Sequence, residues 1–538
     1  MATKRAADYL AERLYEAGCR FAFGIPGGEV LTLVDALETA GIRFILTKHE
    51  NNAGFMAEGT YHMTGAPGIV VATLGPGVAN AVNVTANALQ DKVPLIILSG
   101  CVDEDEALSY THQVIDHQKL FYPISKGTFR LTARGADIVA DKAVNLALDD
   151  RPGPVQIDVP ISIAAEQIDI AKLSRRAATT ASAPRIDETF GAAMVKIDQG
   201  ERPVIVAGLD IMNHNADAEL RALAEHLHAP VITTYKAKGV IPEDHPLSLG
   251  GAGLSPKADT RLVPLLHAAD TIILAGYDPI EMRTGWRDIW DPNRQHVVEL
   301  ASVANDHYMH QSSFSFVGNT KAALSSLINH TKPKTGWPND MPATTRADLR
   351  AEFSADAEWG PAKVIALVRE VMPRNSIATA DSGAHRILQS QMWECFEPRS
   401  LLQSSGLCTM GCAVPLALGA RLGDPDRPAV AFIGDAGMLM ILGELATCAE
   451  VGIPIIVIVF VDASLALIEL KQRGNQMVNR GVDFARYDFA ALAGPLGGCG
   501  VTVANEAELI SALDSALTDD KFTVIACEID RQSYDGVL

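Results

Sequence analysis

Two consecutive apolar runs near the C-terminal end of the chain, AVAFIG (429–434) and IPIIVIVFV (453–461), are each followed by an aspartate. Runs this apolar predict strands that are buried on both faces of a parallel sheet. A charged residue is rare in such surroundings unless it is paired. Asp435 and Asp462 therefore predict a metal ion or a phosphate group between the ends of two strands.

The same alternation of short apolar runs with helical stretches extends along the whole chain. It predicts an α/β fold built from parallel, doubly wound sheets. Small, polar, proline-containing stretches at 174–185 and 331–348 predict linkers, so we expect three domains, at 1–173, 186–330 and 355–538. The predicted strands are 21–25, 43–47, 68–75, 94–100, 155–160, 203–208, 230–235, 271–276, 296–300, 376–383, 429–434, 453–461 and 522–530.

Charge and hydropathy exclude several classes of partner. A net charge of −20 argues against nucleic acid or an anionic membrane surface as the main partner. The first 18 residues predict an amphipathic helix and lack the apolar core of a signal peptide. The apolar run 454–461 is too short to cross a bilayer. We therefore expect a cytoplasmic protein without a membrane partner.

Polar or glycine-rich loops follow many of the predicted strands, where open α/β sheets bind their ligands. Because several such loops occur, they predict one large ligand. Residues 437–451 predict a helix whose N-terminus suits a diphosphate. Neither a GxxxxGK[ST] nor a GxGxxG motif is present, which argues against those nucleotide sites. The loops are GIPGG (24–28), KHENN (48–52), GPGVAN (75–80), DSGAH (381–385), GDAG (434–437) and VDAS (461–464).

Three acidic residues suggest specific chemistry. Asp435 and Asp462, with a backbone carbonyl near Ser464, could hold Mg²⁺, which prefers a few oxygen ligands. Glu50 lies in HENNAGFMAEG among small and apolar residues. If Glu50 is buried there, it could shuttle a proton; taken alone, a glutamate at this place is more often solvated.

Four segments together resemble the thiamine-diphosphate-dependent 2-oxo-acid enzymes, and most closely the acetohydroxyacid (acetolactate) synthase group. They are HENNAGFMAEGTYHMTG (49–65), GPGVANAVNVTANALQDKVPLIILSG (75–100), SGLCTMGCAVPLALGA (405–420) and GDAG…VDAS. The resemblance covers essentially the whole chain. It implies the family order of a pyrimidine-binding, a middle and a diphosphate-binding domain.

The resemblance implies a role for each matching residue. Glu50 corresponds to the glutamate that hydrogen-bonds N1′ of thiamine diphosphate and so promotes loss of the proton from thiazolium C2. Asp435 and Asp462 correspond to the side-chain ligands of Mg²⁺. Gln113 corresponds to an active-site glutamine of the synthases, and Gly27 and Gly28 correspond to a loop that faces the reactive carbon. The remaining cofactor-binding positions are Gly383, Ala384, His385, Met410, Gly434, Ala436, Gly437 and Leu465, with Ser464 beside the metal.

The sequence departs from the usual family pattern at three places. GDA replaces the usual GDG, and Asp462 stands where an asparagine is usual. The segment AGYDPIEMRTGW (275–286) resembles the FAD-free catabolic branch, so no FAD is expected. The paired histidines typical of pyruvate decarboxylases are missing, although His112 and His117 keep that activity open.

The resemblance implies decarboxylation of a 2-oxo acid, pyruvate in the first instance, followed by carboligation to a second 2-oxo acid. One alternative is a non-ligating decarboxylase of a bulkier 2-oxo acid, with a pocket shaped by Leu465, Leu467 and Ile468. Another is an inactive paralogue that only binds. The family also implies a homodimer or homotetramer, in which Glu50 faces Asp435 of the partner subunit.

Overall fold

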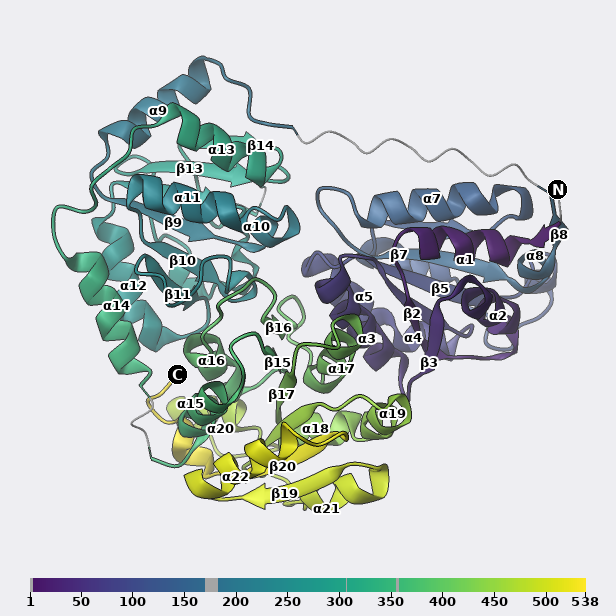
Figure 1. The fold of residues 1–538 in the computed structure, drawn as a ribbon. Helices are drawn as coiled ribbons and strands as arrows, with labels where there is room; N and C mark the ends of the chain where they lie inside the picture. The colour runs from purple at the N-terminus through teal and green to yellow at the C-terminus, as the bar shows by residue number, and fades with distance from the viewer. Residues whose placement is uncertain (1–2, 170–181, 306, 355–357) are drawn as a thin grey trace.

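A computed structural model describes residues 3–169, 182–305, 307–354 and 358–538. It contains three sheets of six parallel strands, each with helices packed on it, so the predicted α/β fold with three parallel-sheet domains is confirmed (Figure 1). The predicted domain ends at 173 and 355, and residues 174–181 of the first predicted linker, lie outside the described residues. In the part of the chain that is described, no helix is long and apolar enough to cross a membrane.

The first domain has the strand order β3-β2-β4-β5-β7-β6. A short antiparallel pair, β1 (Lys4–Arg5) with β8 (Gln167–Ile168), joins its two ends. The strands are β2 (Phe21–Ile25), β3 (Arg43–Leu46), β4 (Gly68–Ala72), β5 (Leu95–Cys101), β6 (Gly127–Arg130) and β7 (Val155–Pro160). The helices are α1 (Ala6–Glu16), α2 (Leu31–Ala40), α3 (Glu50–Thr64), α4 (Pro76–Asn80), α5 (Val82–Gln90), α6 (His117–Phe121), α7 (Ala136–Ala147) and α8 (Ile161–Ala165).

The middle domain has the order β11-β10-β9-β12-β13-β14. Its strands are β9 (Pro203–Ala207), β10 (Val231–Thr234), β11 (Ser248–Ala252), β12 (Thr271–Ala275), β13 (His296–Ala301) and β14 (Phe314–Val317). Its helices are α9 (Glu188–Gln199), α10 (Leu209–Asn213), α11 (Asp217–Leu227), α12 (Pro256–Ala268) and α13 (Thr320–His330). The prediction of a linker over 331–348 is wrong in its second half, because α14 (Met341–Glu352) begins there and packs on α12.

The third domain has the order β16-β15-β17-β18-β20-β19. Its strands are β15 (Ile377–Ala380), β16 (Leu401–Gln403), β17 (Ala429–Gly434), β18 (Ile456–Val461), β19 (Cys499–Val503) and β20 (Thr523–Glu528). Its helices are α15 (Pro361–Val371), α16 (Ala384–Met392), α17 (Ala413–Gly423), α18 (Asp435–Ile441), α19 (Glu444–Val451), α20 (Ala466–Gly474), α21 (Phe489–Ala493) and α22 (Glu506–Ala516). The prediction of a single helix over 437–451 is therefore wrong. The segment forms two helices, α18, which begins at Asp435 and ends at Ile441, and α19.

One apolar core joins the first and third domains. Phe23, Val70 and Ile97 of the first sheet belong to the same buried cluster as Ala431 and Val457 of the third sheet. Helices α3 and α17 cross at the centre of this core, where they lie side by side (Figure 1). The crossing is close because it is made by glycines. A Cβ on Gly59 would lie 2.4 Å from the carbonyl oxygen of Leu416.

Candidate active site

A cavity of about 140 Å³ opens at the carboxyl ends of β15, β17 and β18. Parallel sheets bind ligands at this edge, because the loops after neighbouring strands converge there. Every lining residue comes from the third domain, and the lining includes all the cofactor and metal positions predicted there. The lining residues are Ser382, Gly383, Ala384, His385, Met410, Gly434, Asp435, Ala436, Gly437, Phe460, Asp462, Ser464, Leu465, Ala466, Leu467, Ile468 and Tyr534.

The two aspartates predicted to share a cation are both buried at this edge. Asp435 is the first residue of α18, directly after β17, and Asp462 follows β18. Asp435 Oδ2 accepts hydrogen bonds from the backbone N–H groups of Asp462, at 3.1 Å, and Ala463, at 2.7 Å. Asp462 Oδ1 accepts one from the N–H of Ser464 at 2.9 Å. The N–H groups of residues 462–464 thus fix both carboxylates.

Burial of this pair changes its acid–base behaviour. Desolvation raises the pKa of Asp435 above its ordinary value. Desolvation, together with the negative charge of Asp435, raises the pKa of Asp462 to about 7. A divalent cation would offset both effects, and carboxylate oxygens are ligands that Mg²⁺ accepts. Among the described residues no three His, Cys, Asp or Glu side chains converge on a metal position. A cation here would therefore need oxygens from backbone or ligand as well.

The backbone beside the aspartates leaves room for an anion. Gly383, Ala384 and His385 line the cavity where α16 begins, and the N–H groups in the first turn of a helix lack acceptors within the helix. A Cβ on Gly437 would lie 2.1 Å from Asp381 Oδ2, so a larger residue there would displace the Asp381 carboxylate. The N–H groups at the start of α16 would suit the diphosphate of thiamine diphosphate, and Asp435 and Asp462 would suit Mg²⁺.

Asp381, which the sequence did not mark as a site residue, organises this cavity. Its Oδ1 lies 2.8 Å from His385 Nε2, and its Oδ2 accepts the N–H of Gly411 at 2.8 Å. The ring of His385 stacks on Phe460, with centroids 5.3 Å apart. Asp381 thus connects the loop after β15 to the residue that follows Met410. Its signal in the sequence is its place after a strand, as for Asp435 and Asp462.

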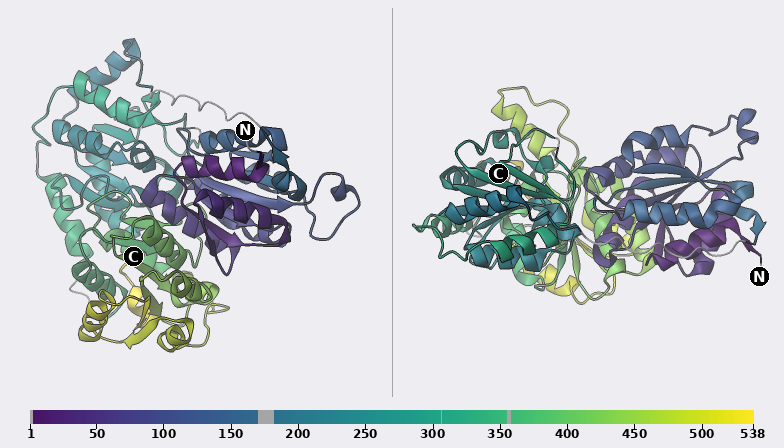
Figure 2. Two further views of the ribbon diagram at one scale, coloured as in Figure 1. Left: turned by 45° about the vertical axis from the view of Figure 1, so that its right-hand side comes forward. Right: turned by 90° about the horizontal axis from the view of Figure 1, so that it is seen from above.

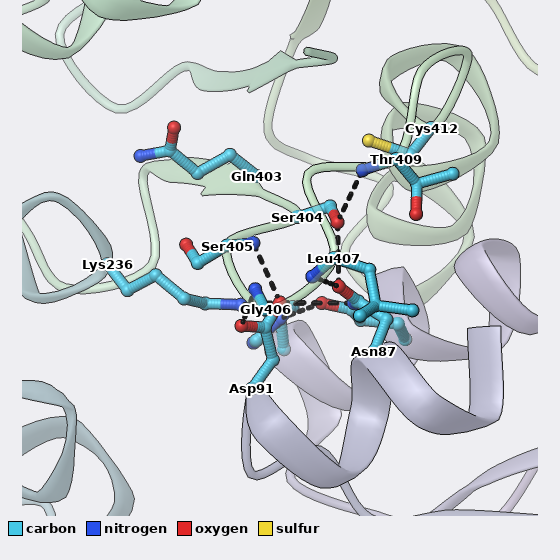
Figure 3. Close-up of polar contacts among 12 residues, drawn as sticks. Asn87, Asp91, Lys236, Gln403, Ser404, Ser405, Gly406, Leu407, Thr409 and Cys412 are labelled. Atoms are coloured by element: carbon cyan, nitrogen blue, oxygen red, sulfur yellow. Dashed lines mark hydrogen bonds and ion pairs between the residues drawn. The ribbon is translucent and has the colours of Figure 1, made fainter. Parts of the chain in front are cut away.

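The loop that carries Met410 is fixed by the first domain (Figure 3). Asp91 accepts hydrogen bonds from the N–H groups of Ser405, at 3.0 Å, and Gly406, at 2.8 Å. Asn87 Oδ1 accepts another from the N–H of Leu407 at 3.1 Å. Because three successive N–H groups are held in this way, the loop conformation depends on side chains of α5 and its C-terminal end.

The middle domain adds a buried cation to this junction. Lys236 Nζ lies 2.9 Å from Asp91 Oδ2 (Figure 3). Lys92, the residue after Asp91, pairs with two carboxylates of the middle domain. Its Nζ lies 2.8 Å from Asp210 and 3.3 Å from Asp278. Two adjacent residues of opposite charge thus tie the first domain to the middle domain, while Asp91 also holds the loop of the third.

Glu50 is buried at the start of α3, which meets the condition set for a role in proton transfer. Its Oε2 accepts a hydrogen bond from Asn80 Nδ2 at 3.0 Å, and a Cβ on Gly77 would lie 3.1 Å from its Oε1. Its carboxylate therefore faces the loop that follows β4. Asn80 was not marked as a site residue, although it belongs to the GPGVAN motif.

The other predicted residues of the first domain gather near the same loop. Gln113 is exposed and lies against Gly75, where a Cβ would meet the Gln113 carbonyl oxygen at 2.4 Å. A Cβ on Gly27 would contact Thr73, two residues before Gly75, and nothing lies within 4 Å of the Cβ position of Gly28. None of these residues, nor Glu50, lines the cavity of the third domain.

His117 holds this loop from the opposite side. Its Nε2 accepts a hydrogen bond from the N–H of Gly75 at 3.3 Å, and its Nδ1 lies 2.9 Å from Asp158 Oδ1. Since Nε2 is an acceptor, the proton of the neutral ring is on Nδ1 and is donated to Asp158. Both ring nitrogens are thus engaged, whereas His112 is exposed.

Comparison with protein families gives three matches in chain order. Residues 4–120 match the model described as "Thiamine pyrophosphate enzyme, N-terminal TPP binding domain". Residues 191–327 match the central domain of the same enzymes, and residues 381–527 match their C-terminal TPP binding domain. Each match falls on one of the three sheets.

Relatives among characterised proteins cover nearly the whole chain. The acetolactate synthase isozyme 1 large subunit of Escherichia coli is 30% identical over 98% of this chain and 94% of its own length. The acetolactate synthase of Bacillus subtilis is 28% identical over 98% of this chain and 93% of its own. The acetolactate synthase large subunit of Corynebacterium glutamicum is 30% identical over 95% of this chain and 84% of its own.

Proposed function

Since this chain belongs to the thiamine pyrophosphate enzyme family, we propose that it decarboxylates pyruvate and joins the resulting two-carbon unit to a second 2-oxo acid. The observation that carries the proposal is the cavity in which Asp435 and Asp462 lie beside the glycine-lined start of α16. The names of the relatives, all acetolactate synthases, support the carboligation step.

The residues of the third domain would hold the cofactor and its metal. Asp435 and Asp462 would bind Mg²⁺ with a backbone oxygen near Ser464, and the N–H groups of Gly383 to His385 would face the diphosphate. Met410 lines the same cavity and would support the rings. Thiamine diphosphate, when bound, supplies an electron sink for the bond that breaks when CO₂ leaves. Leu465 would bound the substrate side of the cavity.

Glu50 would act on this cofactor from a second copy of the chain. Within one chain, its carboxylate faces Gly77 and Asn80 of its own domain and does not line the cavity. A second copy could bring the loop of Glu50, Gln113, Gly27 and Gly28 against the cavity. We therefore propose a homodimer, or a homotetramer built from dimers, as the active form.

Exposed apolar side chains occur beside both halves of the proposed site. Leu108 is 88% exposed in the loop after β5, and Tyr122 is 78% exposed. This loop projects from the first domain (Figure 2, left view). Met440 is 62% exposed on α18, which begins at Asp435. Because large exposed apolar groups favour protein contacts, both surfaces suit an interface between subunits.

The middle domain supports the expectation that FAD is not needed. The crevice at the carboxyl ends of β9, β10 and β12 is where an open sheet of this kind would bind a nucleotide. Here Lys92 enters from the first domain and pairs with Asp210 and Asp278. The cavity that Lys92 and Asp278 line there has a volume of about 10 Å³, too small for a nucleotide.

The direct test is an NMR time course with pyruvate, Mg²⁺ and thiamine diphosphate, without FAD. Acetolactate as the product would support carboligation and the FAD-free assignment together. Acetaldehyde would favour a decarboxylase, and turnover only of larger 2-oxo acids would point to the bulkier substrates, since Leu467 and Ile468 also line the cavity. Failure to bind thiamine diphosphate would favour the alternative of an inactive paralogue. A cytoplasmic location stays a prediction.

A further inference from the structure

A second cavity, of about 660 Å³, lies between the middle and third domains and is separate from the cofactor cavity. One wall is β11 of the middle domain and α14, and the other is formed by α15 and the C-terminal end of α16. The two cavities share no lining residue. Its volume lies within the range of sites for small organic ligands, which is roughly 300–1,000 Å³.

Four arginines line this cleft, although the chain as a whole carries a net charge of −20. Arg346 and Arg350 come from α14, Arg369 comes from α15, and Arg374 follows α15. Arg350 lies 3.3 Å from Glu394, and Arg374 lies 2.6 Å from Asp244. These two guanidinium groups therefore have carboxylate partners.

Arg346 and Arg369 have no carboxylate partner among the described residues. Arg346 donates to the backbone oxygens of Ser248, at 3.1 Å, and Asp244, at 3.1 Å. Arg369 reaches only the oxygens of Pro373, at 3.4 Å, and Arg374, at 3.5 Å, and packs over the ring of Trp393. Burial lowers the pKa of both guanidinium groups, and the negative charge of Glu394 partly opposes this effect at each of them.

Two carboxylates of the cleft form ion pairs with other groups and not with these two arginines. Glu243 is paired with the buried Lys238 at 2.7 Å, and Glu394 with Arg350. Glu370 is exposed to solvent. Among the described residues, the cleft therefore offers two partly desolvated guanidinium groups that form no ion pair, with Glu394 acting on both only at longer range. Leu349, Phe353 and Met392 form an apolar part of the wall beside them.

We propose that this cleft binds a multiply charged phosphate ester of nucleotide size. A guanidinium group presents a planar set of donors that matches phosphate oxygens in a bidentate arrangement. The apolar wall suits the organic part of such a molecule. The site lies at the far end of α16, whose first residues line the cofactor cavity and whose Gln391 and Met392 line the cleft.

Calorimetric titration of ADP into the protein saturated with thiamine diphosphate and Mg²⁺ tests this site, because the cofactor then blocks the other diphosphate position. We expect ADP to bind and adenosine to give no heat. Arg369→Gln and Arg346→Gln should each weaken ADP binding about ten- to hundredfold, the cost of one charge-assisted contact. Arg369→Lys should restore part of the affinity.

Arg287→Gln is the matched control, since Arg287 is exposed on the middle domain and does not line the cleft. It should bind ADP like the unmodified protein. An equal affinity in Arg369→Gln and the unmodified protein would overturn the proposal. So would the absence of any ADP binding up to millimolar concentration. Both results are independent of whether the chain uses pyruvate.

Discussion

Asp435 accepts a hydrogen bond from the backbone N–H of Asp462, at 3.1 Å, so the two carboxylates that end neighbouring strands are held by a direct contact. The contact fixes the turn after β18 against the start of α18. Burial, together with the negative charge of Asp435 beside it, raises the pKa of Asp462 to about 7. On the proposed assignment a cation completes this site, which would explain why acidic residues follow strands that are otherwise wholly apolar.

Asp435→Ala should weaken the Mg²⁺-dependent binding of thiamine diphosphate at least about tenfold, because it removes a ligand and leaves two N–H groups without an acceptor. Asp462→Asn should keep most of the affinity, since an amide oxygen can bind the cation and accept from Ser464. A titration with the cofactor at fixed Mg²⁺, monitored by intrinsic fluorescence, measures the affinity of both variants. Unchanged affinity in Asp435→Ala would contradict the metal assignment.

Glu50→Gln should slow exchange of the C2 proton of bound thiamine diphosphate about a hundredfold or more, the usual scale for loss of an acid–base group. The amide has the same shape and can keep its contact with Asn80, so cofactor binding should survive. Proton exchange followed by NMR in D₂O measures the rate. Equal rates in both proteins would remove Glu50 from the chemistry.

The central strands could be predicted from the sequence because they are buried on both faces. FAFGI and VQIDVP, for example, are β2 and β7 without a shift of one residue. Five strands of the three large sheets were missed, β6, β11, β14, β16 and β19, and all five lie at sheet edges; the short pair of β1 and β8 was missed as well. Edge strands are short or partly exposed, so SLGGA and LLQ lack the long apolar run that marks a buried strand.

The candidate site was predictable where motifs follow strands and not elsewhere. The loops after β15, β17 and β18 supplied the positions that line the cavity, although Asp381 was overlooked within DSGAH. Tyr534 also lines the cavity, but it lies near the C-terminus in a sequence without a motif. The role of Asp91 depends on contacts with three domains, which no local pattern reveals.

Gly59→Ala should destabilise the protein by about 1–3 kcal/mol, because the added methyl group would overlap the backbone of α17. Gly191 in α9 is the matched control, since nothing lies within 4 Å of its Cβ position. Gly191→Ala should stabilise by up to about 1 kcal/mol through helix propensity. Urea unfolding measures both changes. Equal effects of the two substitutions would contradict the close crossing of α3 and α17.

Asp91→Asn should lower the free energy of unfolding by about 3 kcal/mol, because the buried Lys236 loses a carboxylate at 2.9 Å, whereas that of Glu58 lies farther away, at 3.7 Å. Asp116→Asn removes an exposed partner of Lys119 and should cost less than about 1 kcal/mol. Urea denaturation compares the two. Similar small losses would mean that Asp91 does not hold the junction of the three domains.

The central claim is that the cofactor is held by the third domain of one subunit and activated by Glu50 of another. Glu50→Gln and Asp435→Ala should each be inactive alone. When the two variants are mixed in equal amounts and reassembled, half of the dimers are hybrids, and each hybrid has one intact site. About one quarter of the bound cofactor should therefore exchange its C2 proton at the normal rate. No recovery, despite hybrids seen by native mass spectrometry, would contradict the shared site.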